Sequence, residues 1–217
     1  ICENTSVCRT GGIANPSKIQ AGQSQLGMGL DIFSKMARDG SGNYAGKPHD
    51  KLMMVGQSFS DQYLHLIRAA DAPHDFATVF RQKDIRMGVT KAGGSDEVTF
   101  RFVMAHYGET YDSLRAKGWR FVHGDFNELA SAFKDRQIDY VMVALGTPGA
   151  AVIDMAQGRK AQLLAWPADV TSALIQKYGY SPAIFPAGTY PTMQAGPVPA
   201  IAMATTLMVS SDVPEET

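Results

Sequence analysis

Three glycine-containing corners, each at the start of an expected helix, have the residue types needed to bind an anion. They are Thr10-Gly11-Gly12 before Asn15, which is expected to be a helix N-cap, Gly93-Gly94-Ser95 before Asp96, and Gly146-Thr147 before Pro148. The first backbone N–H groups of a helix have no partner within it, and the helix dipole is positive there. Glycine lets a ligand approach the backbone closely, and the Ser95 and Thr147 hydroxyls add donors. One corner alone is more simply an ordinary cap, but three corners spread over two expected lobes favour a ligand site.

Asp31, Gly29 and Tyr190 complete the candidate ligand residues. Asp31 follows an expected strand, where its carboxylate accepts from a ligand amine or caps its own helix, and capping is favoured. Tyr190 lies in an extended segment that could reach the ligand, although a core or hinge role is equally consistent with its position. The predicted ligand-binding residues are Thr10, Gly11, Gly12, Asn15, Gly29, Asp31, Gly94, Ser95, Asp96, Gly146, Thr147 and Tyr190.

The chain also uses one pattern twice, in residues 16–40 and 128–158. Each copy reads as a helix, a Gln-bearing turn, a buried strand, a Gly-containing corner and a second helix closed by glycine. Two copies indicate duplicated lobes and not a solenoid, which needs more repeats. Two α/β lobes would place strand ends and helix N-termini on both sides of one ligand, in a cleft between them.

From Ile85 onward the sequence alternates between strand and helix patterns. Residues 138–145 form a nearly continuous apolar run, which is typical of a parallel strand covered on both faces. Asp125 with Glu128 three residues later predicts a capping box at the start of a helix. The repeated β-α-β order predicts an α/β fold with mainly parallel sheets flanked by helices.

The expected lobes follow from changes in composition along the chain. Residues 1–83 would form the first lobe, 84–185 the second, and the Pro/Gly-rich start of 186–217 would lead back to the first. Within the first lobe, two short strands are expected around a polar turn at residues 57–61. Arg68 and Arg86 flank one expected hinge, where each binds a carboxylate or, more commonly, forms a surface ion pair.

The composition argues against several classes of protein. Lys and Arg number 20 against 21 Asp and Glu, and the formal net charge of -1 gives no electrostatic footprint for nucleic acid. No apolar run approaches the roughly 20 residues of a membrane span, so we expect no membrane-embedded segment. Cys2 and Cys8 lack a C-x-x-C spacing and are compatible with a disulfide or with two free thiols.

No pattern of catalytic or metal-binding residues stands out. The five histidines lack metal-ligand spacing, and neither H-E-x-x-H nor G-x-S-x-G occurs. Gly93-Gly94-Ser95 lacks the Gly-Lys-Ser/Thr ending of a P-loop. We therefore expect a binding protein without catalytic residues, metal or cofactor.

The order of several motifs resembles that of TAXI-type solute receptors of TRAP transporters. The segments are Thr10-Gly11-Gly12-Ile13-Ala14-Asn15-Pro16, Ala21-Gly22-Gln23-Ser24-Gln25-Leu26-Gly27, Gly93-Gly94-Ser95-Asp96-Glu97, Gln137-Ile138-Asp139-Tyr140-Val141-Met142, Gly146-Thr147-Pro148 and Pro186-Ala187-Gly188-Thr189-Tyr190. The resemblance implies a two-lobed type II periplasmic-binding-protein fold, a periplasmic location and capture of glutamate, 2-oxoglutarate or a similar carboxylate. It also implies delivery to TRAP membrane subunits. Such receptors have further elements upstream and downstream, so the first lobe is expected to be incomplete.

Two other functions are compatible with the same scaffold. One is an enzyme similar to the pyrimidine-precursor proteins of thiamin synthesis, for which Lys91 is the lysine best placed to hold a cofactor. The other is a ligand-sensing domain of a transcription regulator, which would need a DNA-binding helix-turn-helix upstream. Fold analogy alone does not choose among them, whereas the order of motifs favours the receptor.

Overall fold

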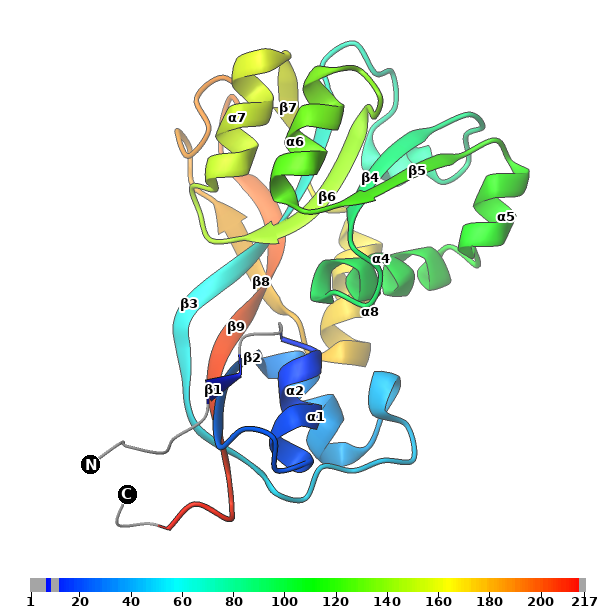
Figure 1. Ribbon diagram of the computed structural model, residues 1–217. Helices are drawn as coiled ribbons and strands as arrows, with labels where there is room; N and C mark the ends of the chain where they lie inside the picture. The colour runs from blue at the N-terminus through cyan, green and yellow to red at the C-terminus, as the bar shows by residue number, and fades with distance from the viewer. Residues whose placement is uncertain (1–6, 9–11, 215–217) are drawn as a thin grey trace. The chain divides into compact units, whose positions relative to one another are not determined.

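The computed structural model describes residues 7–8 and 12–214 (Figure 1). The predicted ligand residues Thr10 and Gly11, like Cys2, lie outside the described residues. The chain forms two compact units, the first from Ile1–Asp61 with Met203–Thr217 and the second from Gln62–Ala202. Two long strands, β3 (Leu52–Ala69) and β9 (Val198–Ser210), contribute residues to both units.

The first unit is a small sheet with short helices. Its elements in chain order are β1 (Val7–Cys8), α1 (Ala14–Gln20), β2 (Leu26–Leu30), α2 (Asp31–Asp39) and the 3-10 helix η1 (Gly42–Tyr44). Strand β2 pairs in parallel with β1 and antiparallel with β9, in the register Leu26↔Val209 to Leu30↔Thr205. Helix α2 ends as predicted, at Gly40 with a left-handed φ of 63°.

Two expectations for the first unit are wrong. Asn15 does not cap α1: the helix begins at Ala14, and the buried Asn15 side chain donates from Nδ2 to the Met28 carbonyl at 2.7 Å. The two expected strands around residues 57–61 are instead the single strand β3. Residues 57–61 of this strand are exposed, and the Ser60 amide donates to Thr205 Oγ1 at 2.8 Å. A stretch of strand that faces solvent need not contain apolar residues, because it is not buried. Its composition can therefore resemble that of a turn.

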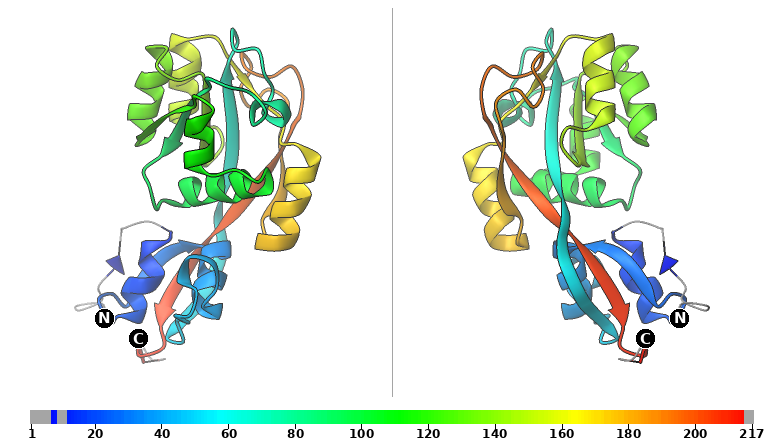
Figure 2. Two further views of the ribbon diagram at one scale, coloured as in Figure 1. Left: turned by 90° about the vertical axis from the view of Figure 1, so that its right-hand side faces the viewer. Right: turned by 90° about the vertical axis from the view of Figure 1, so that its left-hand side faces the viewer.

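The second unit alternates strands and helices. Its elements are α3 (Phe76–Val79), β4 (Arg86–Thr90), α4 (Ser95–His106), α5 (Tyr111–Ala116), β5 (Arg120–Gly124), α6 (Phe126–Lys134), β6 (Tyr140–Leu145), α7 (Ala150–Gly158), β7 (Ala161–Leu163), α8 (Ala168–Tyr178) and β8 (Ser181–Phe185). Strand β4 pairs in parallel with β5 and β6. Helix α6 packs beside α7, and α4 beside α8 (Figure 2). The connections from β4 to β5 and from β5 to β6 run in opposite directions, so right-handed crossovers place α4 and α6 on opposite faces.

The sheet is mixed, which corrects the expectation of mainly parallel strands. Strand β6 pairs antiparallel with β3, β7 pairs antiparallel with β3, and β8 pairs antiparallel with β9. The half of β3 in this unit is buried at Leu64, Leu66 and Ile67. A strand buried on both faces has the same apolar run in either direction, so its sequence does not reveal its orientation.

The two units divide at different places from those expected for the lobes. Residues 62–83 lie in the second unit, as do residues 186–202. The boundary falls inside β3 and again inside β9, where no glycine- or proline-rich segment marks it. The expectation placed hinges at irregular segments, whereas here regular strands continue across the boundary.

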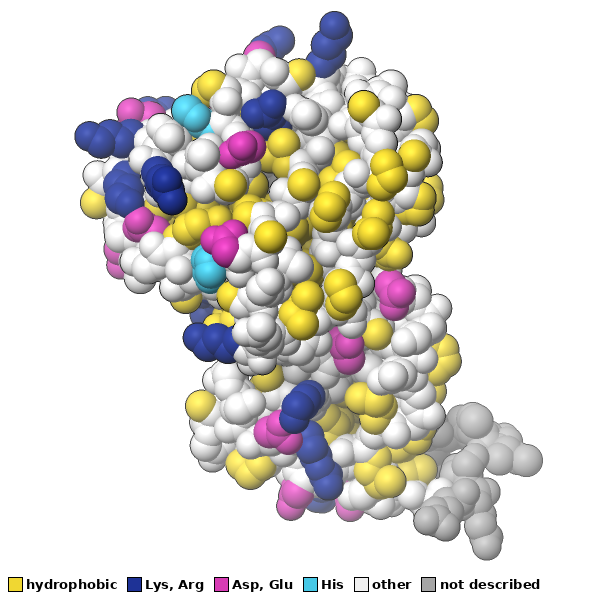
Figure 3. All heavy atoms as spheres, turned by 180° about the vertical axis from the view of Figure 1, so that it is seen from behind, with side chains coloured by type: hydrophobic (Ala, Val, Ile, Leu, Met, Phe, Trp, Pro, Cys, Tyr) yellow, Lys and Arg dark blue, Asp and Glu magenta, His cyan; other side chains and the backbone are white. Residues whose placement is uncertain are grey.

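Some large apolar side chains reach the surface (Figure 3). They are Met28, Met53, Met54, Val55 and Phe59 in the first unit and Phe126, Ile153 and Ile184 in the second. Met53, Met54 and Val55 are consecutive in β3, whereas the others are scattered along the chain, as is normal for folded proteins. Among the described residues, no helix combines the length and apolar character that crossing a membrane requires.

Candidate functional site

A cavity of about 240 Å³ lies in the second unit, where the parallel strands β4 and β5 end and helices α4 and α6 begin. It is lined by Thr90, Lys91, Gly94, Ser95, Asp96, Gly124, Asp125 and Phe126. In open α/β sheets, ligands bind at the carboxyl ends of strands, where the chain departs in opposite directions. The corner Gly94-Ser95-Asp96, predicted from the sequence, is therefore at the edge where the fold favours a ligand.

Helix α4 begins without a side-chain cap. Its N-cap is Gly94, in an extended conformation with φ -74° and ψ 162°. A Cβ on Gly94 would lie 3.1 Å from the Lys91 carbonyl oxygen, which leaves little room for a side chain. The Ser95 hydroxyl, which donates to Asp96 Oδ1 at 2.9 Å, lies at the same corner. The uncapped start of a 12-residue helix gives this cavity N–H donors and the positive end of a dipole.

Asp96 connects this corner to the middle of the sheet. Its carboxylate is buried, with 5% of the residue exposed, and its Oδ2 accepts from the Ala144 amide in β6 at 2.8 Å. Burial raises the pKa of Asp96 to about 6, although the bonds from Ala144 and Ser95 favour the charged form. Asp96 thus holds the start of α4 against β6 and adds an acidic group to the cavity wall.

Helix α6 begins at the same edge but is fully capped by its own side chains. Asp125 Oδ1 accepts from the amides of Asn127 and Glu128 at 3.0 and 2.9 Å, and Glu128 Oε2 accepts from the Asp125 amide at 2.6 Å. This is the predicted capping box. The Lys91 ammonium lies 3.7 Å from the Asp125 carboxylate and 3.4 Å from that of Glu128. A ligand anion therefore finds uncapped amides at α4 and not at α6.

The third predicted corner lies elsewhere in the second unit. Helix α7 begins at Ala150 with Gly149 as its N-cap, so Thr147 and Pro148 precede the cap and do not form it. Gly146 is exposed, and the Thr147 hydroxyl oxygen is buried. Neither residue lines the cavity at α4.

Tyr190 is buried, and its hydroxyl is engaged within the second unit. It accepts from the Gly149 amide at 2.7 Å and lies 2.7 Å from His65 Nε2. His65 Nδ1 lies 2.9 Å from the Tyr63 carbonyl, which only accepts, so Nδ1 carries the proton and Nε2 accepts from Tyr190. Burial lowers the pKa of His65 to about 4, which keeps the ring neutral. This chain of hydrogen bonds fits the core role considered for Tyr190.

The predicted residues of the first unit have roles in local packing. A Cβ on Gly12 would lie 3.0 Å from the Leu30 side chain, and one on Gly29 would lie 2.6 Å from Met208 and 2.7 Å from Ser34. Asp31 Oδ1 accepts from the Ile32 amide at 2.8 Å, so it bonds to the first turn of its own helix. Burial raises the pKa of Asp31. These contacts account for the residue types without a ligand.

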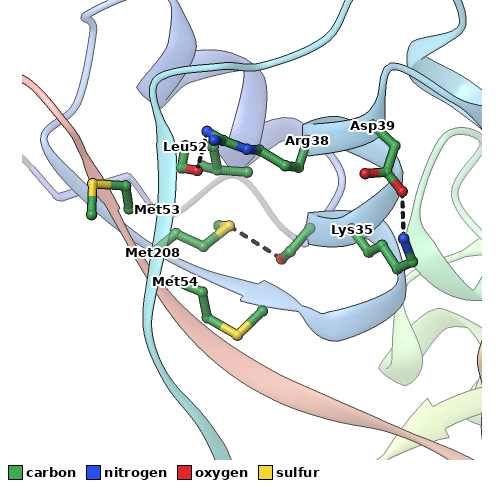
Figure 4. Close-up of a pocket in the computed structure, with 8 residues that line it drawn as sticks. Lys35, Arg38, Asp39, Leu52, Met53, Met54 and Met208 are labelled. Carbon is green, nitrogen blue, oxygen red and sulfur yellow. Dashed lines mark hydrogen bonds and ion pairs between the residues drawn. The ribbon is translucent and has the colours of Figure 1, made fainter.

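A second cavity, of about 470 Å³, lies in the first unit between α2, β3 and β9 (Figure 4). Its walls are largely apolar, with the side chains of Leu52, Met53, Met54 and Met208. Its charged groups already have partners: Lys35 pairs with Asp39 at 2.5 Å, and Arg38 donates to the Leu52 carbonyl at 3.0 Å. This cavity is therefore less suited to an anion than the cavity at α4.

The sequence identified only part of the lining at α4. Thr90, Gly124 and Phe126 were not predicted, and Asp125 was recognised only as a cap. The signal that could have found them is the common edge at which parallel strands end. Among the described residues, no group of three or more His, Cys, Asp or Glu side chains could hold a metal ion.

The whole chain matches a known protein family, and its fold matches solved binding proteins. A model of the NMT1-like family matches residues 3–217. The aliphatic sulphonate binding protein SsuA from Escherichia coli is 14% identical, with a TM-score of 0.51 over 93% of this chain and 53% of that chain. MatC from Rhodopseudomonas palustris, solved with bound malate, is 12% identical, with a TM-score of 0.52 over 96% of this chain and 66% of that chain.

A putative periplasmic sulfonate-binding protein from Methylobacillus flagellatus is 12% identical, with a TM-score of 0.50 over 91% of this chain and 45% of that chain. At these identities the likeness concerns the fold, and it confirms the predicted α/β fold of type II periplasmic-binding proteins. The chain spans about half to two thirds of the length of these structures.

Proposed function

Because this chain belongs to the NMT1-like family and has the fold of periplasmic solute-binding proteins, we propose that it is a solute receptor for a small organic anion. The observation that carries this proposal is the cavity at the carboxyl ends of β4 and β5, where α4 begins without a side-chain cap. Backbone amides at such a helix start bind an anion without a buried cationic side chain.

The residues of the cavity also suggest which anions bind best. A ligand carboxylate would accept from the first amides of α4, with Lys91 nearby. The remaining polar wall is acidic, since Asp96 and Asp125 line it. Carboxylates accept hydrogen bonds from an amine or a hydroxyl, so an acid with such a donor would satisfy both sides. Glutamate and malate are therefore stronger candidates than 2-oxoglutarate or succinate.

We further propose that the receptor acts in the periplasm and passes its ligand to TRAP transporter membrane subunits. This part rests on the order of the TAXI-like motifs along the chain. The structural neighbours include a protein described as part of an ABC transporter, so the fold alone supports a transport role without choosing the type of permease.

Isothermal titration with glutamate, malate, 2-oxoglutarate, succinate, pyruvate and ethanesulfonate would test the proposal. The informative variant is Gly94→Asp, because an Asp at the N-cap would occupy the amides of α4 with its own carboxylate. We expect it to weaken binding of the preferred acid at least about tenfold. Gly94→Ala adds the same Cβ near Lys91 without a carboxylate and is the matched control. Equal affinity in the Asp and Ala variants would contradict a site at α4.

One observation favours a second candidate, an enzyme on the same scaffold: Lys91 lines the cavity. A lysine that forms a Schiff base is desolvated in an apolar pocket, whereas 67% of the Lys91 side chain is exposed and its ammonium lies beside the carboxylates of Asp125 and Glu128. Reductive trapping with pyridoxal phosphate and borohydride, followed by peptide mass analysis, would separate the two functions. Selective labelling of Lys91 over the exposed Lys177 would support the enzyme, and equal labelling of both would favour the receptor.

A further inference from the structure

A second polar pocket lies at the opposite edge of the sheet in the second unit. It has a volume of about 280 Å³ and is located where β4 and β6 begin, at Arg86 and Tyr140. Arg86, Arg136, Arg159 and Lys83 line it together with Asp71 and Asp139. None of these residues lines the cavity at α4. The pocket is therefore a separate feature from the proposed receptor site.

Two carboxylates of this pocket, Asp71 and Asp139, accept hydrogen bonds from arginines through both of their oxygens. Asp139 accepts from Arg86 at 2.7 and 2.8 Å through both oxygens, and from Arg159 at 2.9 Å. Asp71 accepts from Arg159 at 2.8 Å and from Arg136 at 2.9 Å, one bond to each oxygen. The Arg159 guanidinium holds the pKa of Asp71 below its usual range. Two carboxylates thus serve three guanidinium groups.

Cationic donors remain available after these bonds are counted. The pocket is lined by four Lys and Arg side chains against three Asp, the third being Asp84. Lys83 is exposed and forms no ion pair within the described part of the chain. Arg136 bonds to Asp71 through Nη1 alone, and 66% of its side chain is exposed. The unused N–H groups of these two residues have the charge and the donors that an added anion requires.

The backbone at this pocket is held in an unusual conformation. Of the described residues, three that are not glycine have a positive φ, and two of these, Asp84 at 58° and Arg136 at 59°, line the pocket. Arg136 follows the C-cap of α6, where α2 and α8 end with glycine at φ 63° and 83°. A left-handed conformation costs a non-glycine residue free energy, so an arginine there calls for a functional reason.

We propose that this pocket binds a phosphate or sulfate group, held by Arg136 and Lys83 with Arg86 and Arg159 behind them. A tetrahedral oxyanion can accept two parallel hydrogen bonds from one planar guanidinium and further bonds from an ammonium. The Arg86 guanidinium also donates to the Arg136 carbonyl at 2.6 Å, which fixes the backbone that carries the Arg136 side chain. The ligand is either the free ion or the same group carried on an organic molecule.

The test is the thermal shift of the full chain with inorganic phosphate, compared with sodium chloride at the same ionic strength. For a Kd of about 1 mM, 10 mM phosphate should raise Tm by about 3 °C. Arg136→Gly keeps the backbone geometry that glycine favours and should lose at least about two thirds of this shift while its own Tm stays close to that of the parent. Arg115→Gln, at a half-exposed arginine of α5, is the matched control and should keep the full shift.

Two further arms make the result specific. Gly94→Asp should keep the phosphate shift, so failure of the α4 site and failure of this pocket are distinguishable. Titration with glycerol 3-phosphate beside inorganic phosphate distinguishes a carried group, which would bind more tightly as the ester, from the free ion, which would not. No shift in the parent chain, or an equal shift in Arg136→Gly, would overturn the proposal.

Discussion

The two pockets at opposite edges of the sheet in the second unit differ in the donors that each presents to an anion. At the carboxyl ends of β4 and β5, the donors are the uncapped amides of α4, and the buried side chain nearest to them is the acidic Asp96. At the amino ends of β4 and β6, the donors are guanidinium groups and the backbone amides take little part. Backbone dipoles recognise shape at short range, whereas full charges act over a Debye length and are screened by salt.

This contrast also exists between two helices at one edge. Helix α4 begins with Gly94, and α6 begins with the Asp125–Glu128 capping box. A capped helix gains stability from its own side chains and gives up its amides as a binding site. The glycine at α4 forgoes that stability and leaves the first amides of the helix available, as the proposed anion site requires.

Of the changes considered, replacing Asp139 in the pocket where β4 and β6 begin should lower stability the most. Asp139 has 17% of its side chain exposed, and its loss would leave Arg86 and the buried Arg159 without their shared partner. We expect Asp139→Ala to lower the free energy of unfolding by about 3–5 kcal/mol, measured by urea denaturation. Asp112→Ala removes the acid of an exposed pair, with 94% of the Asp112 side chain exposed, and should cost at most about 1 kcal/mol. Equal losses would mean that the buried pair is not essential.

At the cavity at α4, Asp96 should make the free energy of unfolding depend on pH. The folded pKa of Asp96, about 6, lies above its ordinary value of 3.8, so the folded state binds the proton more tightly than the unfolded state. Stability contributed by protonated Asp96 is therefore present below about pH 4 and is lost as pH rises through 6, by about 2–3 kcal/mol in total.

Asp96→Asn is the matched variant for this prediction, because an amide oxygen can still accept from the Ala144 amide. In urea denaturation between pH 4 and 8, the free energy of unfolding of the parent chain relative to the variant should fall as pH rises through 6, because the opposite contribution of His65 is common to both chains. The same slope in both chains would assign the pH dependence to other groups.

A smaller change is expected when the cap of α6 is removed. Asp125→Ala removes the hydrogen bonds that Asp125 Oδ1 accepts from two amides, and it should lower the free energy of unfolding by about 1–2 kcal/mol. It also frees amides at the same cavity, so the affinity for a carboxylate ligand should rise, as measured by titration. The variant would thus make α6 resemble α4, and unchanged affinity would argue against amides as the ligand donors.

Features carried by neighbouring residues could be predicted from the sequence. The capping box of α6, the glycine ends of α2 and α8 and the corner before α4 all depend on residues within a few positions of each other. The continuity of β3 and its antiparallel pairing with β6 could not be predicted, because they depend on partners far along the chain. The same is true of Asn15, whose side chain finds the Met28 carbonyl only after β2 has packed against α1.

The candidate site, too, could be predicted only where it depends on neighbouring residues. Gly94, Ser95 and Asp96 were found from a local pattern, whereas Thr147 and Tyr190 lie elsewhere in the second unit. For Arg86, the sequence left open a ligand role or an ion pair, and the structure pairs it with Asp139, 53 positions away. Its place in a pocket with Arg136 and Arg159 depends on how β4, α6 and α7 come together at one edge. The spacing of these residues along the chain does not predict that β4, α6 and α7 come together.

The smallest expected change in stability concerns the backbone at Arg136, in the pocket where β4 and β6 begin. Arg136→Gly relieves the positive φ of 59° and loses an ion pair whose partners are 66% and 57% exposed. Relief of the left-handed conformation and loss of an exposed pair nearly offset each other, so the free energy of unfolding should change by less than about 1 kcal/mol. Arg136→Gln loses the same pair but keeps the unfavourable φ, so urea denaturation should find it less stable than the glycine variant. The reverse order would mean that the left-handed conformation carries no net backbone cost at Arg136, and the unusual φ would then need no ligand to explain it.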